Sequence, residues 1–194
     1  PATGRPRQLV MLGERLGVQR VIHQGTGREQ ALAQIAALDV TFSPSKSVSV
    51  LWALADDETR RVIVEAHDQA VDDGLAYLDA NARHARAGRG GVRRVDTDGF
   101  VIAKFRHRTA RQTTRDRVGD PQFHTHCAIL NRVRCADGKW RTLDGQAIYA
   151  HAHAAGALYG SRLEQLLTER LGVAWATPAA GERGASLWRD ALVR

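Results

Sequence analysis

Two histidines with one residue between them, His124 and His126, stand near the start of the apolar segment FHTHCAIL. Residues two apart in a β-strand point to the same face, so this spacing sets both imidazoles side by side. Two protonated imidazoles at that separation repel each other, whereas two neutral ones can share a cation. The pattern indicates a metal site, with two hydrogen-bonded surface histidines as the alternative.

A third histidine can complete this site. The segment from Val101 to His107 alternates with a period of two and predicts a strand that precedes the HxH pair. If the two strands pair, His107 comes within reach of the other imidazoles. Three imidazoles leave coordination positions open, as a catalytic ion requires, and imidazole suits zinc and other transition metals better than magnesium. The sequence predicts a divalent-metal site of His107, His124 and His126.

A second HxH pair, His151 and His153, serves as an internal control. It lies at the start of a helix that we expect over residues 153–172, ended by Gly172. Residues two apart on a helix are separated by about 200° around the axis and cannot hold one ion. We interpret this pair as helix-cap or surface residues.

Acidic and basic residues accompany the candidate site. Asp39 opens the strand DVTFS, where a carboxylate lies at a solvated edge, orients an imidazole or acts as a general base. Lys46, at the expected start of the helix VSVLWAL, is a solvated lysine or a phosphate contact. Arg106, Arg108 and Arg111 flank the third histidine, and guanidinium groups suit phosphate oxygens. We expect these four basic residues to bind nucleic acid; a solvated loop is the alternative for the arginines.

The composition of the 194-residue chain agrees with a nucleic-acid partner. The formal net charge is +7 and comes almost wholly from arginine, while hydrophobic residues make up 43% of the chain, enough for a real core. A basic domain attracts nucleic acid without sequence preference. A genome rich in G and C, which favours arginine and alanine codons, explains the same composition.

The two cysteines, Cys127 and Cys135, form neither a CxxC motif nor a disulfide framework. Their small number favours a reducing, cytoplasmic location. The sequence has no apolar run of about 18 residues and no visible signal peptide, so we expect no membrane insertion.

The pattern of elements predicts an α+β fold. We expect strands at 38–43, hairpins over 92–109 (turning at 96–99) and 123–144 (turning at 137–138), and helices over 28–38, 48–54, 56–85 and 153–172. In the long helix, small or apolar residues recur every four positions from Val62 to Leu78. This order of elements is typical of an antiparallel sheet covered by helices on one face.

Four segments of the sequence together resemble a known family. In chain order they are DVTFSPSKSVSVLWAL, FRHRTAR, DPQFHTHCAILNRV and YAHAHAAGALYGSRLEQLLTERLGVAW. They are similar, in order, to the relaxase domain of conjugative relaxases of the TrwC/TraI (MobF) type, which belong to the HUH endonucleases. The resemblance implies a two-layer sandwich around a five-stranded antiparallel sheet. It also implies three parts: an N-terminal remnant (1–34), a relaxase core (35–176) and a C-terminal tail or start of a linker (177–194).

The resemblance also implies a reaction. The three histidines match the family's ligands for a divalent ion (Mg, Mn or Zn), which polarises the scissile phosphate. Asp39 matches the acidic residue beside the nucleophile and the metal. A tyrosine attacks the DNA at a plasmid transfer origin and forms a 5′-phosphotyrosine, and the strand is later rejoined. The implied partners are single-stranded or hairpin DNA and the conjugation machinery.

The sequence departs from the family pattern at several positions. FSPSKS stands for the usual FSAPKS, Ala110 replaces a serine, and the loop between His107 and His124 is longer. The family's nucleophilic tyrosines lie upstream of the DVTFS strand. Here the only tyrosines are three that fall in or beside expected helices: Tyr77, Tyr149 and Tyr159. We therefore expect the nucleophile to be absent from this chain and the chain alone to be inactive.

Two alternatives to a relaxase core remain. The first is a DNA-binding relaxase homologue or fragment without nuclease activity. The second is a metallohydrolase in which bound water attacks, although no glutamate stands at the spacing from the histidines that is typical of zinc hydrolases.

Overall fold

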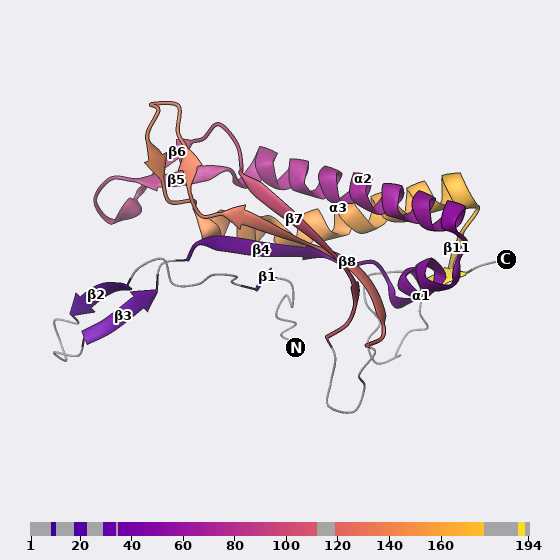
Figure 1. Ribbon diagram of the computed structural model, residues 1–194. Coiled ribbons are helices and arrows are strands. Elements are labelled where there is room, and N and C mark those ends of the chain that lie inside the picture. The colour runs from indigo at the N-terminus through magenta and orange to yellow at the C-terminus, as the bar shows by residue number, and fades with distance from the viewer. Residues whose placement is uncertain are drawn as a thin grey trace, which may run out of the picture.

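The computed structural model describes residues 9–10, 18–22, 29–33, 35–111, 119–176 and 190–192. Its main sheet has the strand order β1-β4-β8-β7, and every neighbouring pair is antiparallel (Figure 1). The strands are β1 (Leu9–Val10), β4 (Ala37–Phe42), β7 (Ile102–Thr109) and β8 (Pro121–Leu130). The expected strand at 38–43 is thus confirmed as β4. The described residues supply four strands of this sheet, against the five expected.

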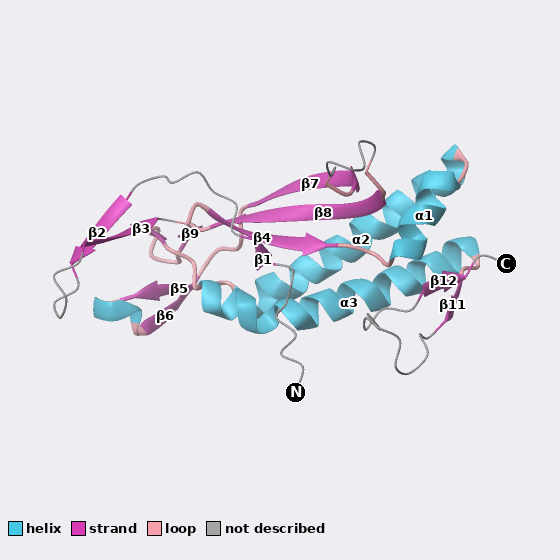
Figure 2. Ribbon diagram, turned by 90° about the horizontal axis from the view of Figure 1, so that it is seen from below, coloured by secondary structure: helices cyan, strands magenta, loops and turns pink. Residues whose placement is uncertain are grey.

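Three helices accompany the sheet: α1 (Lys46–Leu54), α2 (Asp57–Ala82) and α3 (Gly145–Leu171). The two long helices α2 and α3 run side by side along one face of the sheet (Figure 2). The α+β class is confirmed, and so are the helices expected over 48–54 and 56–85. None of the helices among the described residues combines the length and apolar character needed to cross a membrane.

The core lies between this sheet face and the helices. On β4, the alternate residues Leu38, Val40 and Phe42 are buried against the helix layer. On α2, the four-residue repeat places Ala66, Ala70, Gly74 and Leu78 in the same core. The buried face of the strand, with its period of two, therefore packs against the buried face of the helix, with its period of about 3.6. Both faces are those that the sequence pattern predicts.

Side-chain caps begin the two long helices. The Asp56 carboxylate accepts the Thr59 N–H at 2.7 Å, and the Asp144 carboxylate accepts the Gln146 N–H at 3.2 Å. Gly172 ends α3 with φ of 67°, a conformation that favours glycine, as predicted. Because Asp144 caps it, α3 begins at Gly145, well before the expected start at residue 153.

The remaining strands form two-stranded ribbons. They are β2 (Val18–Ile22) with β3 (Glu29–Ala33), β5 (His84–Ala87) with β6 (Arg93–Asp96), β9 (Val133–Arg134) with β10 (Trp140–Arg141), and β11 (Ala174–Ala176) with β12 (Asp190–Leu192). A short 3₁₀ helix, Arg89–Gly91, joins β5 to β6. The expected helix over 28–38 is wrong, because residues 29–33 are a strand paired with β2 and the chain enters β4 at Ala37.

The hairpin expected over 92–109 is also wrong. β6 pairs with β5, and β7 pairs with β8. The segment between them is held by distant partners: the Asp98 N–H donates to the Arg134 carbonyl, and the Phe100 N–H donates to Asp79 of α2. The turn predicted at 137–138 is confirmed between β9 and β10, but β8 pairs with β4 and β7 rather than with β10.

Candidate metal centre on the open face of the sheet

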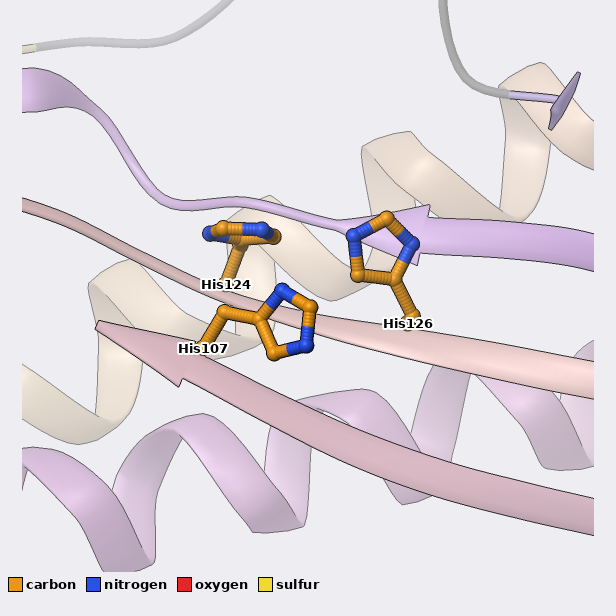
Figure 3. Close-up of side chains that lie close together, drawn as sticks. All are labelled: His107, His124 and His126. Carbon is orange, nitrogen blue, oxygen red and sulfur yellow. The ribbon is translucent and has the colours of Figure 1, made fainter. Parts of the chain in front are cut away.

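Three histidines converge on the face of the sheet that the helices leave open (Figure 3). His107 on β7 lies directly opposite His124 on β8, and His126 follows two residues later on the same strand. The three ring centroids are 4.9 to 5.1 Å apart, and one candidate ligand nitrogen from each ring lies within 4.8 Å of the others. The predicted strand pairing that unites the three imidazoles is confirmed.

Hydrogen bonds donated by Nδ1 leave two of these rings in the form that binds a metal. Nδ1 of His124 donates to the Gln122 carbonyl at 2.7 Å, and Nδ1 of His126 donates to Oδ2 of Asp39 at 2.6 Å. Carbonyl and carboxylate oxygens only accept, so the proton of each ring lies on Nδ1. The Nε2 lone pair of both rings is therefore available for a cation.

Burial keeps the His124 ring neutral. Desolvation lowers the pKa of His124 below its ordinary value of 6.5, and the neighbouring imidazoles His126 and His107 act in the same direction. A metal ion binds the neutral imidazole and competes with a proton for the same lone pair. The environment thus favours the form of His124 that a metal requires.

Asp39 lies under this cluster and is fully buried. The alternation of β4 places Asp39 and Thr41 on the open face, and Thr41 is the cross-strand partner of His126. The Thr41 hydroxyl lies 3.0 Å from Nδ1 of His126 and donates a longer bond of 3.4 Å to Oδ2 of Asp39. Oδ1 of Asp39 is buried without a hydrogen-bond partner within the described part of the chain. One carboxylate oxygen therefore fixes a ligand ring while the other keeps its accepting capacity.

The basic residues predicted to flank the site separate into two groups. Lys46 lies near the start of β8, where its Nζ donates to the Pro121 carbonyl at 2.8 Å and lies 3.4 Å from Asp120. The Arg111 side chain, just beyond the end of β7, is exposed. Both residues lie near the ends of the strands that carry the histidines, and Lys46 is held there by its contacts with Pro121 and Asp120.

Arg106 and Arg108 have other neighbours. They alternate with His107 on β7, so their side chains belong to the opposite face. Arg106 forms an ion pair with Asp68 of α2, and the Arg108 guanidinium lies 5.6 Å from the ring centroid of Trp52 on α1. The structure does not bring these two arginines together with the histidines, and their predicted role in nucleic-acid binding is supported by no contact on the open face among the described residues.

All three tyrosines lie on the long helices. Tyr77 on α2 is hydrogen-bonded to His151 at 3.1 Å, Tyr149 on α3 is 43% exposed, and Tyr159 on α3 is buried. The second HxH pair lies within α3, and its members do not join the cluster of three histidines. None of these described tyrosines shares the open face with the metal centre.

Residue-by-residue reasoning from the sequence did not single out Thr41, His67 or Thr125. Thr41 follows Asp39 by two residues on a predicted strand, so alternation alone could have identified it. His67 is buried in α2 between Thr125 and Tyr159. No local pattern indicates His67, because its partners are 58 and 92 residues away along the chain.

Comparisons with known proteins identify a family and relatives of this chain. The family model described as TrwC relaxase matches residues 5–187. The multifunctional conjugation protein TraI of Escherichia coli (strain K12) is 34% identical over 155 residues, which cover 75% of this chain and 8% of TraI. The chain thus spans a small fraction of that relative's length.

Solved structures of the conjugative relaxase TrwC are similar as well. One, metal-bound and in complex with oriT DNA, has a TM-score of 0.63 and 34% identity, covering 84% of this chain and 52% of that chain. Another, copper-bound and also with oriT DNA, has a TM-score of 0.64 and covers 89% of this chain and 53% of that chain. This chain therefore spans about half the length of the TrwC chains it matches.

Proposed function

Because the chain belongs to the TrwC relaxase family, we propose that it is the metal-binding core of a conjugative DNA relaxase. Such an enzyme nicks one DNA strand at a transfer origin and later rejoins it. The observation that carries the proposal is the convergence of His107, His124 and His126, with two of the rings holding their protons on Nδ1. TraI and TrwC are described as conjugation proteins, and TrwC is solved with oriT DNA.

The donor set fits a divalent transition metal. Three imidazoles, two of them with an available Nε2 atom, are ligands of the kind that zinc and copper accept. The carboxylate of Asp39 on His126 is the carboxylate–histidine arrangement that orients a ligand ring and raises its basicity. When bound, a divalent ion supplies Lewis-acid polarisation of the scissile phosphate and steadies its developing charge.

We assign the other predicted residues on the same basis. Asp39 holds the His126 ring through Oδ2, and its unpartnered Oδ1 supports a role as proton acceptor. Lys46 and Arg111, near the strand ends that carry the histidines, bind the phosphates that flank the reacting one. The same role for Arg106 and Arg108 stays a prediction.

The nicking step requires a tyrosine from outside the three that this chain contains. A tyrosine oxygen attacks phosphorus, the bond from phosphorus to the 3′-oxygen breaks, and the released 3′-oxygen takes a proton. Tyr77, Tyr149 and Tyr159 lie on the helices, away from the open face. We propose that this chain alone holds metal and single-stranded or hairpin DNA without cutting, which is also the alternative of a nuclease-inactive homologue.

We also propose a complete sheet, a division of the chain, a protein partner and a location. The complete domain has a five-stranded sheet, of which β1, β4, β8 and β7 supply four strands. The parts 1–34, 35–176 and 177–194 remain our division of the chain. The conjugation machinery is the proposed protein partner, and the two free, buried cysteines support a cytoplasmic location.

Metal analysis of matched variants tests the proposal. The test variant is His124→Ala/His126→Ala, and the control is His151→Ala/His153→Ala, which removes the other HxH pair. We expect one divalent ion per chain in the wild type and in the control, and none in the test variant. Equal ion content in all three chains, or none in any, would refute the proposed site.

A further inference from the structure

A buried polar chain runs from the metal-binding strand into both long helices. Thr125 lies on β8 between His124 and His126 and points the opposite way, into the helix layer. Its Oγ1 is 2.8 Å from Nε2 of His67 on α2, and Nδ1 of the same ring is 2.9 Å from the Tyr159 hydroxyl on α3. Strand and helices are thus joined by directional bonds inside the buried layer.

The His67 ring is fully committed to these two bonds. Burial lowers the pKa of His67 to about 3, so the ring is neutral at ordinary pH. A neutral imidazole has one donor and one acceptor, and here each faces a hydroxyl group. Phe123 packs against the ring with centroids 4.7 Å apart. A satisfied polar group in a core restricts its partners to one geometry more strictly than apolar packing does.

This restriction acts where β4 ceases to pair with β8, while β7 continues to pair with it. Pairing with β4 ends at Phe42 opposite Thr125, and pairing with β7 shifts register between His107 and Thr109. Beyond the end of β4, the Phe123 N–H donates instead to the Ser49 hydroxyl of α1 at 3.1 Å. Beside His124 the helix layer therefore stands where β4 no longer supports β8, and β7 supports the other edge of the strand.

We infer that His67 is a positioning residue for the metal centre, acting through Thr125 to fix the segment of β8 that carries His124 and His126. The inference rests on the proposed function and adds a residue from the opposite side of the sheet. His67 does not touch the metal. It limits how far the two ligand rings move relative to His107.

Cobalt titration of the full 194-residue chain tests this role. Thr125→Val keeps the side-chain shape and removes the hydroxyl, Thr125→Ser restores a hydroxyl, and Ile129→Val trims a buried residue on the same face of β8 that has no such bond. Affinity for Co²⁺ gives the strength of the site, and the visible absorption of bound Co²⁺ reports its ligand geometry.

We expect Thr125→Val to weaken Co²⁺ binding by about threefold to tenfold. Loss of a group that is hydrogen-bonded directly to a metal ligand weakens binding by about 10- to 100-fold, and Thr125 acts less directly. The absorption spectrum should change as well. Thr125→Ser should restore both, and Ile129→Val should match the wild type. Unfolding curves identify any variant that does not fold, and His67→Phe then breaks the same bond from its other end.

Two results would overturn the inference, and they differ from each other. If folded Thr125→Val binds Co²⁺ with the affinity and the absorption spectrum of the wild type, the hydrogen bonds of Thr125, His67 and Tyr159 have a structural role only. The metal site itself is then unaffected. A wild-type chain that binds no Co²⁺ would remove the proposed metal site itself, and with it anything to be positioned.

Discussion

The carboxylate of Asp39 accepts a hydrogen bond from Nδ1 of His126 at 2.6 Å, across the pair of strands β4 and β8. The acid is fully buried, and its second oxygen has no partner among the described residues. An unpaired buried carboxylate oxygen is costly, so the position of Asp39 reflects the ring that it holds rather than a gain in stability.

Asp39→Asn should therefore separate metal binding from stability. The amide either donates to His126 or accepts from it, so the ring loses its fixed tautomer. We expect metal affinity to fall about 10- to 100-fold, with no loss in the free energy of unfolding. Competition with a chelator measures the affinity. Asp98→Asn, an exposed acid on another segment, is the control; equal affinity in both variants would contradict the role of Asp39.

Lys46 and Arg106 should respond differently to replacement by alanine. Lys46 is held at the start of β8, the strand that carries two of the histidines, so its loss should weaken binding of a single-stranded oligonucleotide and lower the salt slope by about 0.7. Arg106 is paired with Asp68 and lies 6.0 Å from the Phe123 ring, so its loss should chiefly reduce stability. Arg170→Ala, at the end of α3, controls for net charge. A larger change in salt slope for Arg106→Ala than for Lys46→Ala would contradict the assignment of Lys46 to DNA binding and of Arg106 to stability.

His67 should make the fold sensitive to acid. Its pKa is about 3 in the folded chain, against the ordinary histidine value of 6.5, so the unfolded chain takes up the proton first as pH falls. This contribution to stability is complete above pH 6.5 and is lost as pH falls toward 3, on the order of 4 kcal/mol in total. His67→Gln lacks this titration.

Urea unfolding between about pH 7.5 and pH 4, a range that covers most of this titration, measures the effect. His67→Gln should be less stable than the wild type at the upper end of the range but should lose less stability on acidification. His153→Gln removes an exposed imidazole and should keep the wild-type pH dependence. Parallel curves for the wild type and His67→Gln would show that His67 is not buried as a neutral ring.

Gly74 lies where α2 packs closely against Phe42 of β4 and Ala155 of α3. A Cβ at this position would lie 2.8 Å from Cε1 of Phe42 and 3.3 Å from the Ala155 carbonyl oxygen. Gly74→Ala should destabilise the fold by about 1–3 kcal/mol, although alanine favours a helix. Because the nearest atom belongs to the Phe42 ring, Phe42→Leu should cost less in the Gly74→Ala background than alone. Additive losses in thermal unfolding would argue against this contact.

Local features of this protein follow from short stretches of its sequence. The period of two on β8 placed His124 and His126 on the face opposite Phe123, Thr125 and Cys127, because alternation is a property of the strand alone. The helices expected over 48–54 and 56–85 correspond to α1 and α2, and Gly172 ended α3. The order of several motifs indicated the relaxase family, which the comparisons confirm.

Which segments are neighbours became clear only from the folded chain. The segment 92–109 was predicted as one hairpin, but β6 pairs with β5 and β7 with β8, because contacts with Asp79 and Arg134 hold the intervening chain. The same limit applies to His67, whose partners come from another helix and from the sheet. The spacing of residues along one element predicts which way each side chain points. Pairing between distant segments depends instead on the packing of the whole chain.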